Sequence, residues 1–383
     1  MTTRVDTRNQ SNKLLGLEFI RFVTAFAVLV WHYQHFFYVA EQPVDFVREQ
    51  QPLYCGLSLL YQHGYSGVQI FWCISGFIFF WKYRDPIAQR IVGPLKFFVL
   101  RFSRLYPLHF GTLLLVAFLQ GLYFARQGYF FVYQSNDVRH FLAQLLMASD
   151  WLPQGVDHSF DGPVWSISVE VLVYLLFFVV LRYIGKSAWI NLAVVLLCVA
   201  AKAAKVESPI LECLGLFYAG GLGAMALQHF ASRKYSLQAG AVLAAALLAP
   251  LVLGRALRSY GLDQQELSSY VFLVAYVPVL LYVAAQDLPV PPILQRMVAA
   301  AGNMTYSSYL LHFPIQLTIA LLCASTGQDI PRYSVAFFTA FMLTTLVASY
   351  YVYRYFEMPT QDRIRTLFKE RSRLPARSAT SAV

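Results

Sequence analysis

Arg21 and His32 lie in one apolar run, and both side chains could take part in acid–base or anion chemistry. The run, from Gly16 to Val39, is long enough to cross a bilayer as a helix. With about 3.6 residues per turn, their spacing returns to nearly the same face, about 16 Å along the axis. Ionisable residues inside a membrane helix are candidates for function. The alternative is that Arg21 anchors the helix at the membrane surface with Glu18 as its partner, and that His32 is an interfacial histidine.

A second apolar run begins with two arginines, Arg101 and Arg104, in the segment RFSRLYP. They are three residues apart, so they share one helical face. Guanidinium groups bind phosphate in a bidentate manner, and helix N-termini favour anions. The pair therefore suits a phosphate-bearing ligand, although anchoring of a cytoplasmic helix end explains the same residues.

Ser166 and Glu170 are four residues apart at the start of another run, which places them on one helical face. A carboxylate about two turns inside the membrane is costly unless it is bonded or protonated. We expect Glu170 to act in catalysis or to orient a histidine, and Ser166 to line the same site. A structural ion pair from Glu170 to another span is the alternative.

Ser308 and His312 repeat this spacing in the polar segment TYSSYLLHFP, just before Pro314. They could contribute to a substrate site, or the serines could bond locally where proline loosens the helix. By contrast, Ser75 and Gly76 in an apolar stretch favour close contact between helices.

These residues need membrane helices to position them. The chain has 383 residues, of which 58% are hydrophobic and only 13% charged, whereas soluble proteins carry about 25% charged residues. We predict an all-α integral membrane protein with about ten transmembrane helices. Their expected ranges are 15–39, 66–82, 98–124, 163–184, 187–204, 210–228, 236–254, 267–285, 300–323 and 334–356.

The distribution of basic residues predicts the orientation. With ten spans, 22 of the 30 Lys and Arg residues lie on the side that carries both termini, which the positive-inside rule makes cytoplasmic. We therefore expect residues 1–13 to form a cytoplasmic tail, residues 14–358 the membrane domain, and residues 359–383 a basic, disordered cytoplasmic tail. The net charge of +10 reflects these clusters and does not indicate nucleic-acid binding.

The longest predicted outside loop, residues 125–162, contains many aromatic and acidic residues. Such residues suit contact with sugars, but aromatic side chains at a membrane interface are also ordinary anchors. An interfacial helix is predicted near residues 136–148.

Five segments in this order resemble the integral-membrane acyltransferase-3 superfamily over about residues 14–358. They are the Arg21-to-His32 spacing, GVQIFWCISGF at 67–77, RFSRLYP at 101–107, VWSISVE at 164–170 and TYSSYLLHFPI at 305–315. The resemblance implies a ten-span core, acyl-CoA as the donor, a catalytic role for His32, and donor binding by Arg101 and Arg104. Two departures are Gln69, where the family often has an acidic residue, and Val171, where a second carboxylate is common.

From the resemblance we expect a membrane O-acyltransferase that moves an acyl group, with acetyl expected, from acyl-CoA to a hydroxyl of a cell-surface or lipid-linked saccharide. Imidazole suits a general base, and a covalent acyl-histidine route stays open. We expect Arg21 to orient or bind the donor. The resemblance also implies a bacterial inner membrane location, and we expect no bound cofactor and no metal.

Three other classes of protein remain open from the residues alone. In a transporter or flippase of a sugar or lipid intermediate, the buried charges would line a pathway. A glycan polymerase or ligase would use a lipid-diphosphate donor. A non-catalytic member of an envelope assembly would use the same spans only as a scaffold. Release of CoA that depends on His32 would discriminate against all three.

Overall fold

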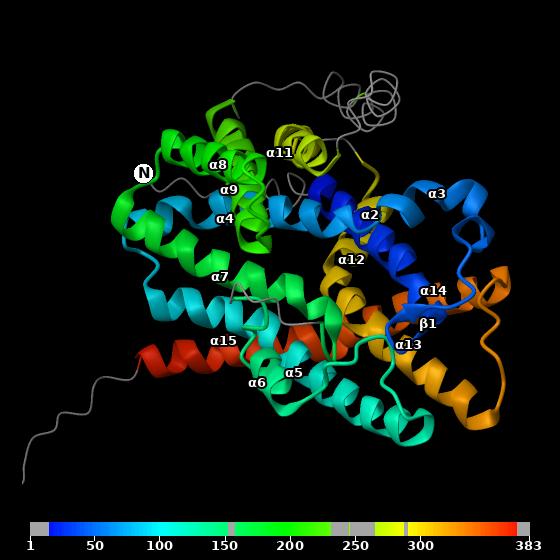
Figure 1. Ribbon diagram of the computed structural model, residues 1–383. Helices are drawn as coiled ribbons and strands as arrows, with labels where there is room; N and C mark the ends of the chain where they lie inside the picture. Colours follow the sequence, from blue (N-terminus) through cyan, green and yellow to red (C-terminus); the bar gives the residue numbers. More distant parts are fainter. Residues whose placement is uncertain (1–14, 152–157, 231–244, 246–264, 287–289, 374–383) are drawn as a thin grey trace, which may run out of the picture.

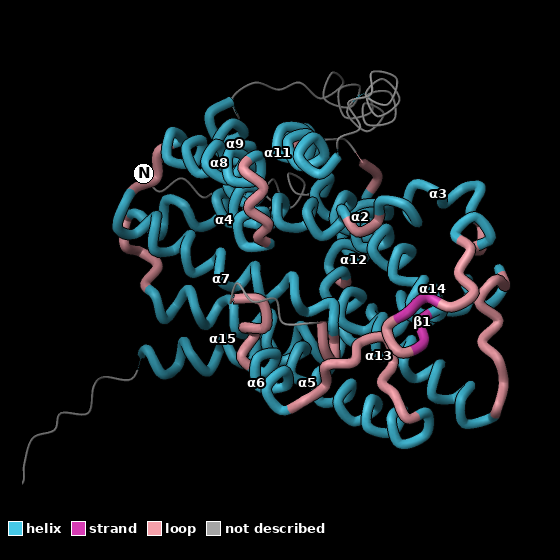
Figure 2. The backbone as a smooth tube through the Cα atoms, in the orientation of Figure 1, coloured by secondary structure: helices cyan, strands magenta, loops and turns pink. Residues whose placement is uncertain are grey.

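The computed structural model describes residues 15–151, 158–230, 245, 265–286 and 290–373. Helices account for nearly all of the regular structure in these ranges (Figure 2). The one exception is a short hairpin of β1 (Tyr38–Val39) and β2 (Gln42–Pro43), in which Tyr38 pairs with Pro43. The predicted helical class is therefore confirmed for the described part of the chain.

Figure 1 shows how the helices are arranged. The α-helices are α2 (Leu15–His32), α3 (Tyr54–His63), α4 (Ser66–Ala88), α5 (Pro94–Gln127), α6 (Val138–Leu145), α7 (Trp165–Val179), α8 (Ala188–Ala203), α9 (Pro209–Phe230), α11 (Gln265–Ala284), α12 (Pro292–Asn303), α13 (Thr305–Thr326), α14 (Val335–Val352) and α15 (Met358–Arg373). Short 3₁₀ or π turns are η1 (Tyr33–Phe37), η2 (Arg48–Gln50), η3 (Gly162–Val164), η4 (Val180–Ile184) and η5 (Tyr353–Glu357).

The number of spans differs from the prediction of about ten. Among the described residues, seven helices are long and apolar enough to cross a membrane, or eight if α3 and α4, which are bent by 64° at their junction, form one span. The predicted span 187–204 corresponds to α8, whose 16 residues fall short of the usual transmembrane length. The predicted span 236–254 lies outside the described residues.

The hydrophobic core is densest around α4. This helix packs along α9, and α9 also contacts α8 and α11, so that these helices form one side of the molecule (Figure 1). Phe77, Phe79 and Phe217 are buried between them, and Phe79 stacks on Tyr174 of α7 with ring centroids 4.1 Å apart. Aromatic rings thus fix how α4 and α7 lie beside each other.

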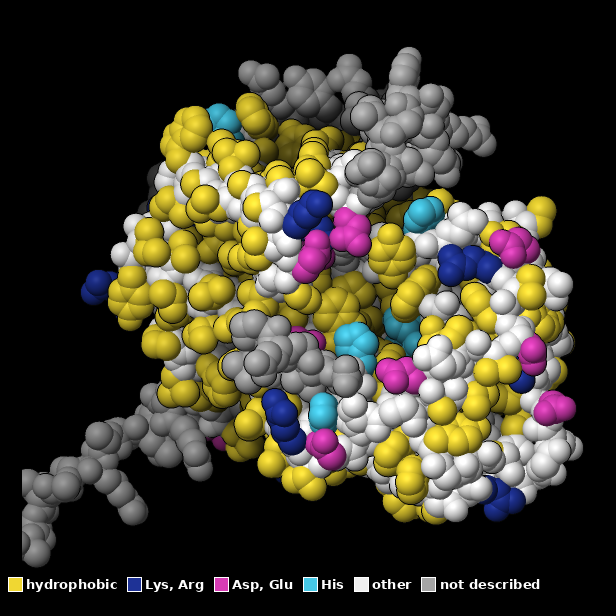
Figure 3. Space-filling view, in the orientation of Figure 1, with side chains coloured by type: hydrophobic (Ala, Val, Ile, Leu, Met, Phe, Trp, Pro, Cys, Tyr) yellow, Lys and Arg dark blue, Asp and Glu magenta, His cyan; other side chains and the backbone are white. Residues whose placement is uncertain are grey.

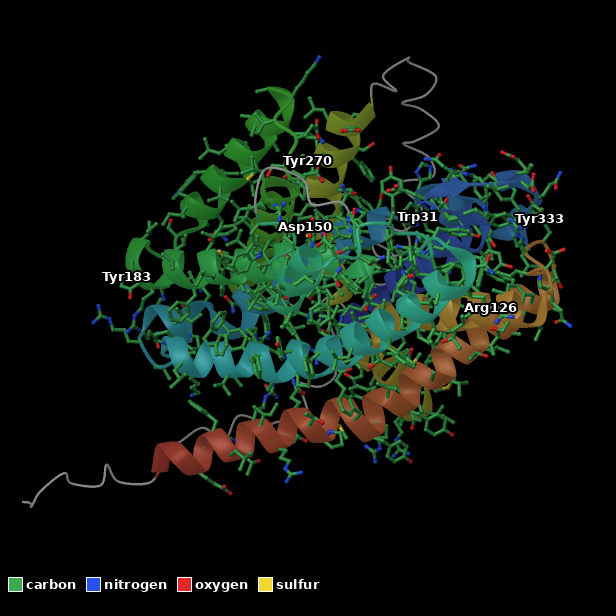
Figure 4. The ribbon with its side chains drawn as sticks, turned by 60° about the horizontal axis from the view of Figure 1, so that its bottom comes forward. Trp31, Arg126, Asp150, Tyr183, Tyr270 and Tyr333 are labelled. Carbon is green, nitrogen blue, oxygen red and sulfur yellow. The ribbon has the colours of Figure 1, made fainter. Side chains whose placement is uncertain are left out.

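The other side of the molecule is built on α5, a helix of 34 residues that packs against α13 and α15. Near its end, Arg126 donates to the carbonyl oxygens of Ala324 and Ser325 at 2.9 and 2.8 Å, which satisfies carbonyls at the end of α13. Figure 4 shows Arg126 where the two helices meet. The long predicted spans 98–124 and 300–323 thus form a packed pair.

The C-terminal prediction was wrong in part. Residues from 359 onward were expected to be disordered, but α15 continues as a helix to Arg373 and lies along α5 (Figure 4). Local sequence could not show this, because the helix is polar and draws its stability from contact with α5. Residues 374–383 of the predicted tail lie outside the described residues.

Two smaller expectations concern the outer segments. The first predicted span, 15–39, is helical only to His32, and η1 continues it as a tighter 3₁₀ turn, which is common at helix ends. The predicted helix near 136–148 is present as α6, and the Asp137 side chain caps it by accepting from the backbone N–H of His140 at 2.9 Å.

Candidate active site

A cavity of about 380 Å³ lies between α2, α4, α5, α7, α13 and α15. Its wall on α4 extends from Val68 to Tyr83, which is about 22 Å of helix. The charged side chains in the wall are Glu18, Arg21, Lys82, Arg101, Arg104, Glu170 and Arg365. Five of these seven side chains are cationic, so the cavity favours an anionic ligand.

Arg21 is held in place by its own helix and by α13. One Nη atom lies 2.8 Å from a Glu18 carboxylate oxygen, and the other donates to the Thr305 hydroxyl at 3.1 Å. The pairing of Arg21 with Glu18 is therefore confirmed. A Cβ at Gly302 would overlap Glu18, so the close approach of α12 fixes the position of this ion pair.

Arg101 points into the cavity and not toward an ion-pair partner. One Nη donates to the Tyr83 hydroxyl at 2.7 Å, and the guanidinium carbon lies 4.7 Å from the centroid of Phe79. The Nε atom is buried and has no hydrogen-bond partner among the described residues. A buried donor without an acceptor is costly, which is the condition that an incoming anion would relieve.

Arg104 lies one turn further along α5. Its only carboxylate neighbour among the described residues is Glu357, with an N–O distance of 3.9 Å. Glu357 instead accepts a hydrogen bond of 2.6 Å from the Ser307 hydroxyl. The charge of Arg104 is thus only loosely compensated, and Arg104 lines the cavity together with Arg101.

Ser166 and Glu170 both line the cavity from α7. Among the described residues no Lys, Arg or His side chain forms a salt bridge with Glu170, so the predicted structural ion pair is not present. Two hydroxyl groups of the same wall, those of Ser75 and Tyr174, lie 2.9 Å apart. On this side of the cavity the polar groups are thus hydroxyls and the Glu170 carboxyl group, to which Ser75 and Tyr174 are hydrogen-bonded.

His32 lies outside the cavity lining, in a group of three histidines. Its ring centroid is 4.7 Å from that of His312 and 4.9 Å from that of His35. Its Nδ1 atom lies 2.9 Å from the carbonyl oxygen of Val28. Because a carbonyl only accepts, the proton of the neutral ring is on Nδ1 and the lone pair is on Nε2.

Gln316 of α13 links this group to the first helix. Its amide nitrogen donates to the carbonyl oxygen of His32 at 2.9 Å, and its oxygen lies 3.2 Å from Nδ1 of His35. His312 is fully buried, and neither ring nitrogen has a hydrogen-bond partner among the described residues. Figure 3 shows histidine side chains in the hollow at the centre of one face of the molecule.

Tyr309 connects the cavity to the histidines. Its hydroxyl donates to the carbonyl oxygen of Pro163 at 2.7 Å and lies 2.8 Å from Ser166 Oγ, while its ring centroid is 5.9 Å from that of His312. The cavity therefore ends at Ser166 and Tyr309, and His312 lies between Tyr309 and His32. The tyrosine and two histidines form a continuous row of rings.

The predicted site residues thus fall into three places. Arg21, Arg101, Arg104, Ser166 and Glu170 line one cavity. His32 and His312 are in contact beyond its end. Ser308 lies apart from both groups. Its hydroxyl donates to the Thr305 carbonyl oxygen at 3.0 Å within the same helix, as expected if the serines of this segment bond locally.

Four residues that shape the site were not predicted. Tyr309 precedes His312 by three residues, so helical spacing alone could have placed it on the same face. Lys82 appeared only as a basic residue at a span end, and Tyr174 lies one turn beyond Glu170. Arg365 carried no signal, because it lies in the segment expected to be disordered.

The sequence comparisons identify the family. A family model described as an acyltransferase domain matches residues 14–354, so the chain belongs to the acyltransferase-3 family. Its apolar helices and this membership define a multi-pass membrane protein of the acyltransferase-3 family.

One curated relative is the acyltransferase MdmB of Streptomyces mycarofaciens, 29% identical over 168 residues. The match covers 43% of this chain and 38% of that protein, so the chain spans less than half of the length of this relative. No solved structure matches the chain.

Proposed function

We propose that this acyltransferase moves an acyl group, with acetyl expected, from acyl-CoA to a hydroxyl of a cell-surface or lipid-linked saccharide in a bacterial inner membrane. The observation that carries the proposal is the cation-lined cavity, which leads along α4 to Ser166 and Tyr309 and so to the histidines. Arginines at one end suit the phosphates of CoA. The length of the cavity suits an extended thioester arm.

In this proposal His32 is the general base. The acceptor hydroxyl gives its proton to Nε2 while its oxygen attacks the carbonyl carbon of the thioester. The carbon–sulfur bond then breaks, and the leaving thiolate takes the proton from the imidazolium. The hydrogen bond from Nδ1 to the Val28 carbonyl holds the ring in the tautomer that this step needs. Since Tyr309 and His312 lie between the cavity and His32, their rings must shift for the thioester to reach it.

The other predicted site residues have supporting roles. Arg21 orients the donor, because it lines the same cavity about three turns from His32. Glu170 and Ser166 present oxygen atoms beside the path of the acyl arm. His312 shields the reacting atoms from water, since it is buried against His32.

Replacing His32 tests the proposal. We expect His32→Ala to lower acyl transfer at least 100-fold, because a general base typically contributes 10²–10⁴-fold, with the same amount of folded protein. The measurement is proton NMR of extracted envelope glycans together with thiol release from acetyl-CoA by purified protein. His229→Ala is the matched control, because His229 is exposed at the end of α9.

Near-normal transfer by the His32 variant would remove His32 from the mechanism. Movement of a sugar or lipid across the membrane without a new acyl bond would instead favour a transporter. Acyl signals that require wild-type protein would also show which glycan is the acceptor.

A further inference from the structure

The C-terminal helix α15 lies beyond the matched family region, which ends at residue 354. It runs beside α5 in two views of the molecule (Figures 1 and 4). Gln361 and Arg365 of this helix belong to the cavity wall. A segment outside the matched region therefore helps to close the candidate active site.

Arg365 is fixed to the turn of α5 that carries the two predicted arginines. Its Nε donates to the Ser103 hydroxyl at 3.2 Å, and one Nη donates to the Leu100 carbonyl at 3.4 Å. Ser103 lies between Arg101 and Arg104 in the sequence. These contacts use two of the five guanidinium N–H groups, and no acceptor among the described residues bonds the others.

The local charge is not balanced by the protein. Lys82, Arg101, Arg104 and Arg365 share the cavity, and Arg104 alone of these four has a carboxylate within 4.0 Å, at 3.9 Å, among the described residues. Like charges that share one cavity repel each other. The unpartnered Nε of Arg101 adds an unsatisfied donor at the same place. Anchors for lipid headgroups would face outward, whereas these groups share one cavity.

We propose that α15 is part of the donor site, and that Arg365 together with Lys82, Arg101 and Arg104 forms a four-cation site for a ligand with several phosphate groups. The identification of this ligand as acyl-CoA rests on the proposed function. The site suits a diphosphate, because three arginines can each offer two parallel N–H groups. Arg365 binds the donor and takes no part in proton transfer.

The test compares Arg365→Gln with Arg363→Gln in full-length purified protein. Arg363 is exposed on the same helix, so its replacement removes the same charge without changing the cavity. We measure KM and kcat for acetyl-CoA by thiol release, and the binding of CoA and of inorganic pyrophosphate by calorimetry. Arg365→Lys, which keeps the charge, and melting temperatures of all variants control for misfolding.

We expect Arg365→Gln to raise the KM for acetyl-CoA about tenfold with kcat little changed, because a hydrogen bond from a charged group is worth about one factor of ten or more. Pyrophosphate binding should weaken similarly, Arg365→Lys should recover part of the affinity, and Arg363→Gln should match wild type. Equal KM and equal binding for Arg365→Gln and wild type would overturn the inference.

The two proposals fail in different ways. If wild-type protein binds pyrophosphate through Arg365 but neither binds CoA nor releases thiol, the anion site stands and acyl-CoA is the wrong donor. If acetyl-CoA is a substrate and Arg365 has no effect on its KM, the donor is right and α15 is not part of its site. A melting temperature lowered equally in Arg365→Gln and Arg365→Lys, with an unchanged KM, would assign Arg365 a structural role only and overturn the inference.

Discussion

A charged side chain inside a membrane protein has to be compensated by neighbours or reserved for a ligand. Arg21 is compensated, because Glu18 and Thr305 both contact its guanidinium. Arg101 is not, since its Nε is buried without an acceptor. Two arginines that look alike in the sequence therefore differ in what they can bind, and the difference lies in the side chains around them.

Asp161 is a second residue without compensation, at the entrance to α7 and outside the spanning helices. It is fully buried, and neither carboxyl oxygen has a hydrogen-bond partner among the described residues. Burial raises the pKa of the Asp161 carboxyl group to about 8. At neutral pH the group is therefore mainly protonated in the folded protein.

This shifted pKa predicts a pH dependence of stability. Between about pH 4 and pH 8 the unfolded chain loses the Asp161 proton while the folded chain keeps it, so the free energy of unfolding falls as the pH rises. Asp161→Asn is neutral at every pH and should lose this part of the slope. We expect the melting temperature of Asp161→Asn, relative to that of wild type, to increase as the pH is raised from 5 to 8.

The comparison uses purified protein in one detergent, and the difference between the two melting temperatures is read at each pH. All other titrating groups contribute equally to both proteins. Parallel melting curves for wild type and Asp161→Asn across this range would show that Asp161 is ionised in the folded state.

At the scale of elements, the contact between α4 and α9 sets the position of the cavity wall. Gly76 lies against the backbone of Phe217, and Gly220 lies against the backbone of Cys73. The expectation that Ser75 and Gly76 serve close helix packing is confirmed for Gly76, while Ser75 faces the cavity. Small residues here let two backbones approach closely.

Two glycine substitutions, one at this contact and one on α5, should have opposite effects on stability. A Cβ at Gly76 would overlap the carbonyl of Phe217, whereas a Cβ at Gly111 meets nothing within 4 Å. We expect Gly76→Ala to destabilise the protein by about 1–3 kcal/mol, as overpacking does. Gly111→Ala should stabilise the protein by about 0.5–1 kcal/mol, because glycine inside a helix loses more conformational freedom on folding than alanine does. Thermal unfolding in detergent measures both.

Equal stability of the two variants would mean that α4 and α9 can separate at no cost. In that case the wall that carries Ser75, Phe79 and Lys82 would not be rigid, and the width of the cavity could change.

At the scale of the whole molecule, the cations and the histidines occupy opposite ends of one path. The cations line the end formed by α5 and α15, and the histidines lie beyond Tyr309. In the predicted orientation the first end faces the cytoplasm, where acyl-CoA is made available, and the second faces outward. The arrangement suits transfer of a group from one side of the membrane to an acceptor on the other.

The orientation itself can be measured. Cys55 is exposed on α3, which the positive-inside rule places outside. We expect a membrane-impermeant maleimide to label the wild type in intact spheroplasts, and Cys55→Ser to lose most of this label. If the label appears only after the membranes are broken, the orientation is the reverse of the predicted one. His32, His35 and His312 would then lie toward the cytoplasmic side.

The sequence by itself was sufficient for the helical class and for the positions of most apolar helices, and it singled out five residues that line the cavity. These features depend on local hydrophobic runs and on helical spacing, and both can be read from one amino-acid sequence. It also predicted the pairing of Arg21 with Glu18, because the two residues lie three positions apart on one helix.

Only the tertiary structure decided which of these residues share a space. Spacing along α13 could not separate His312, which contacts His32, from Ser308, which bonds within its own helix. Nor could it show that α15 lies along α5 and brings Arg365 to Ser103. Such contacts join residues far apart in the chain, and their energy depends on how the helices pack, which local pattern does not contain.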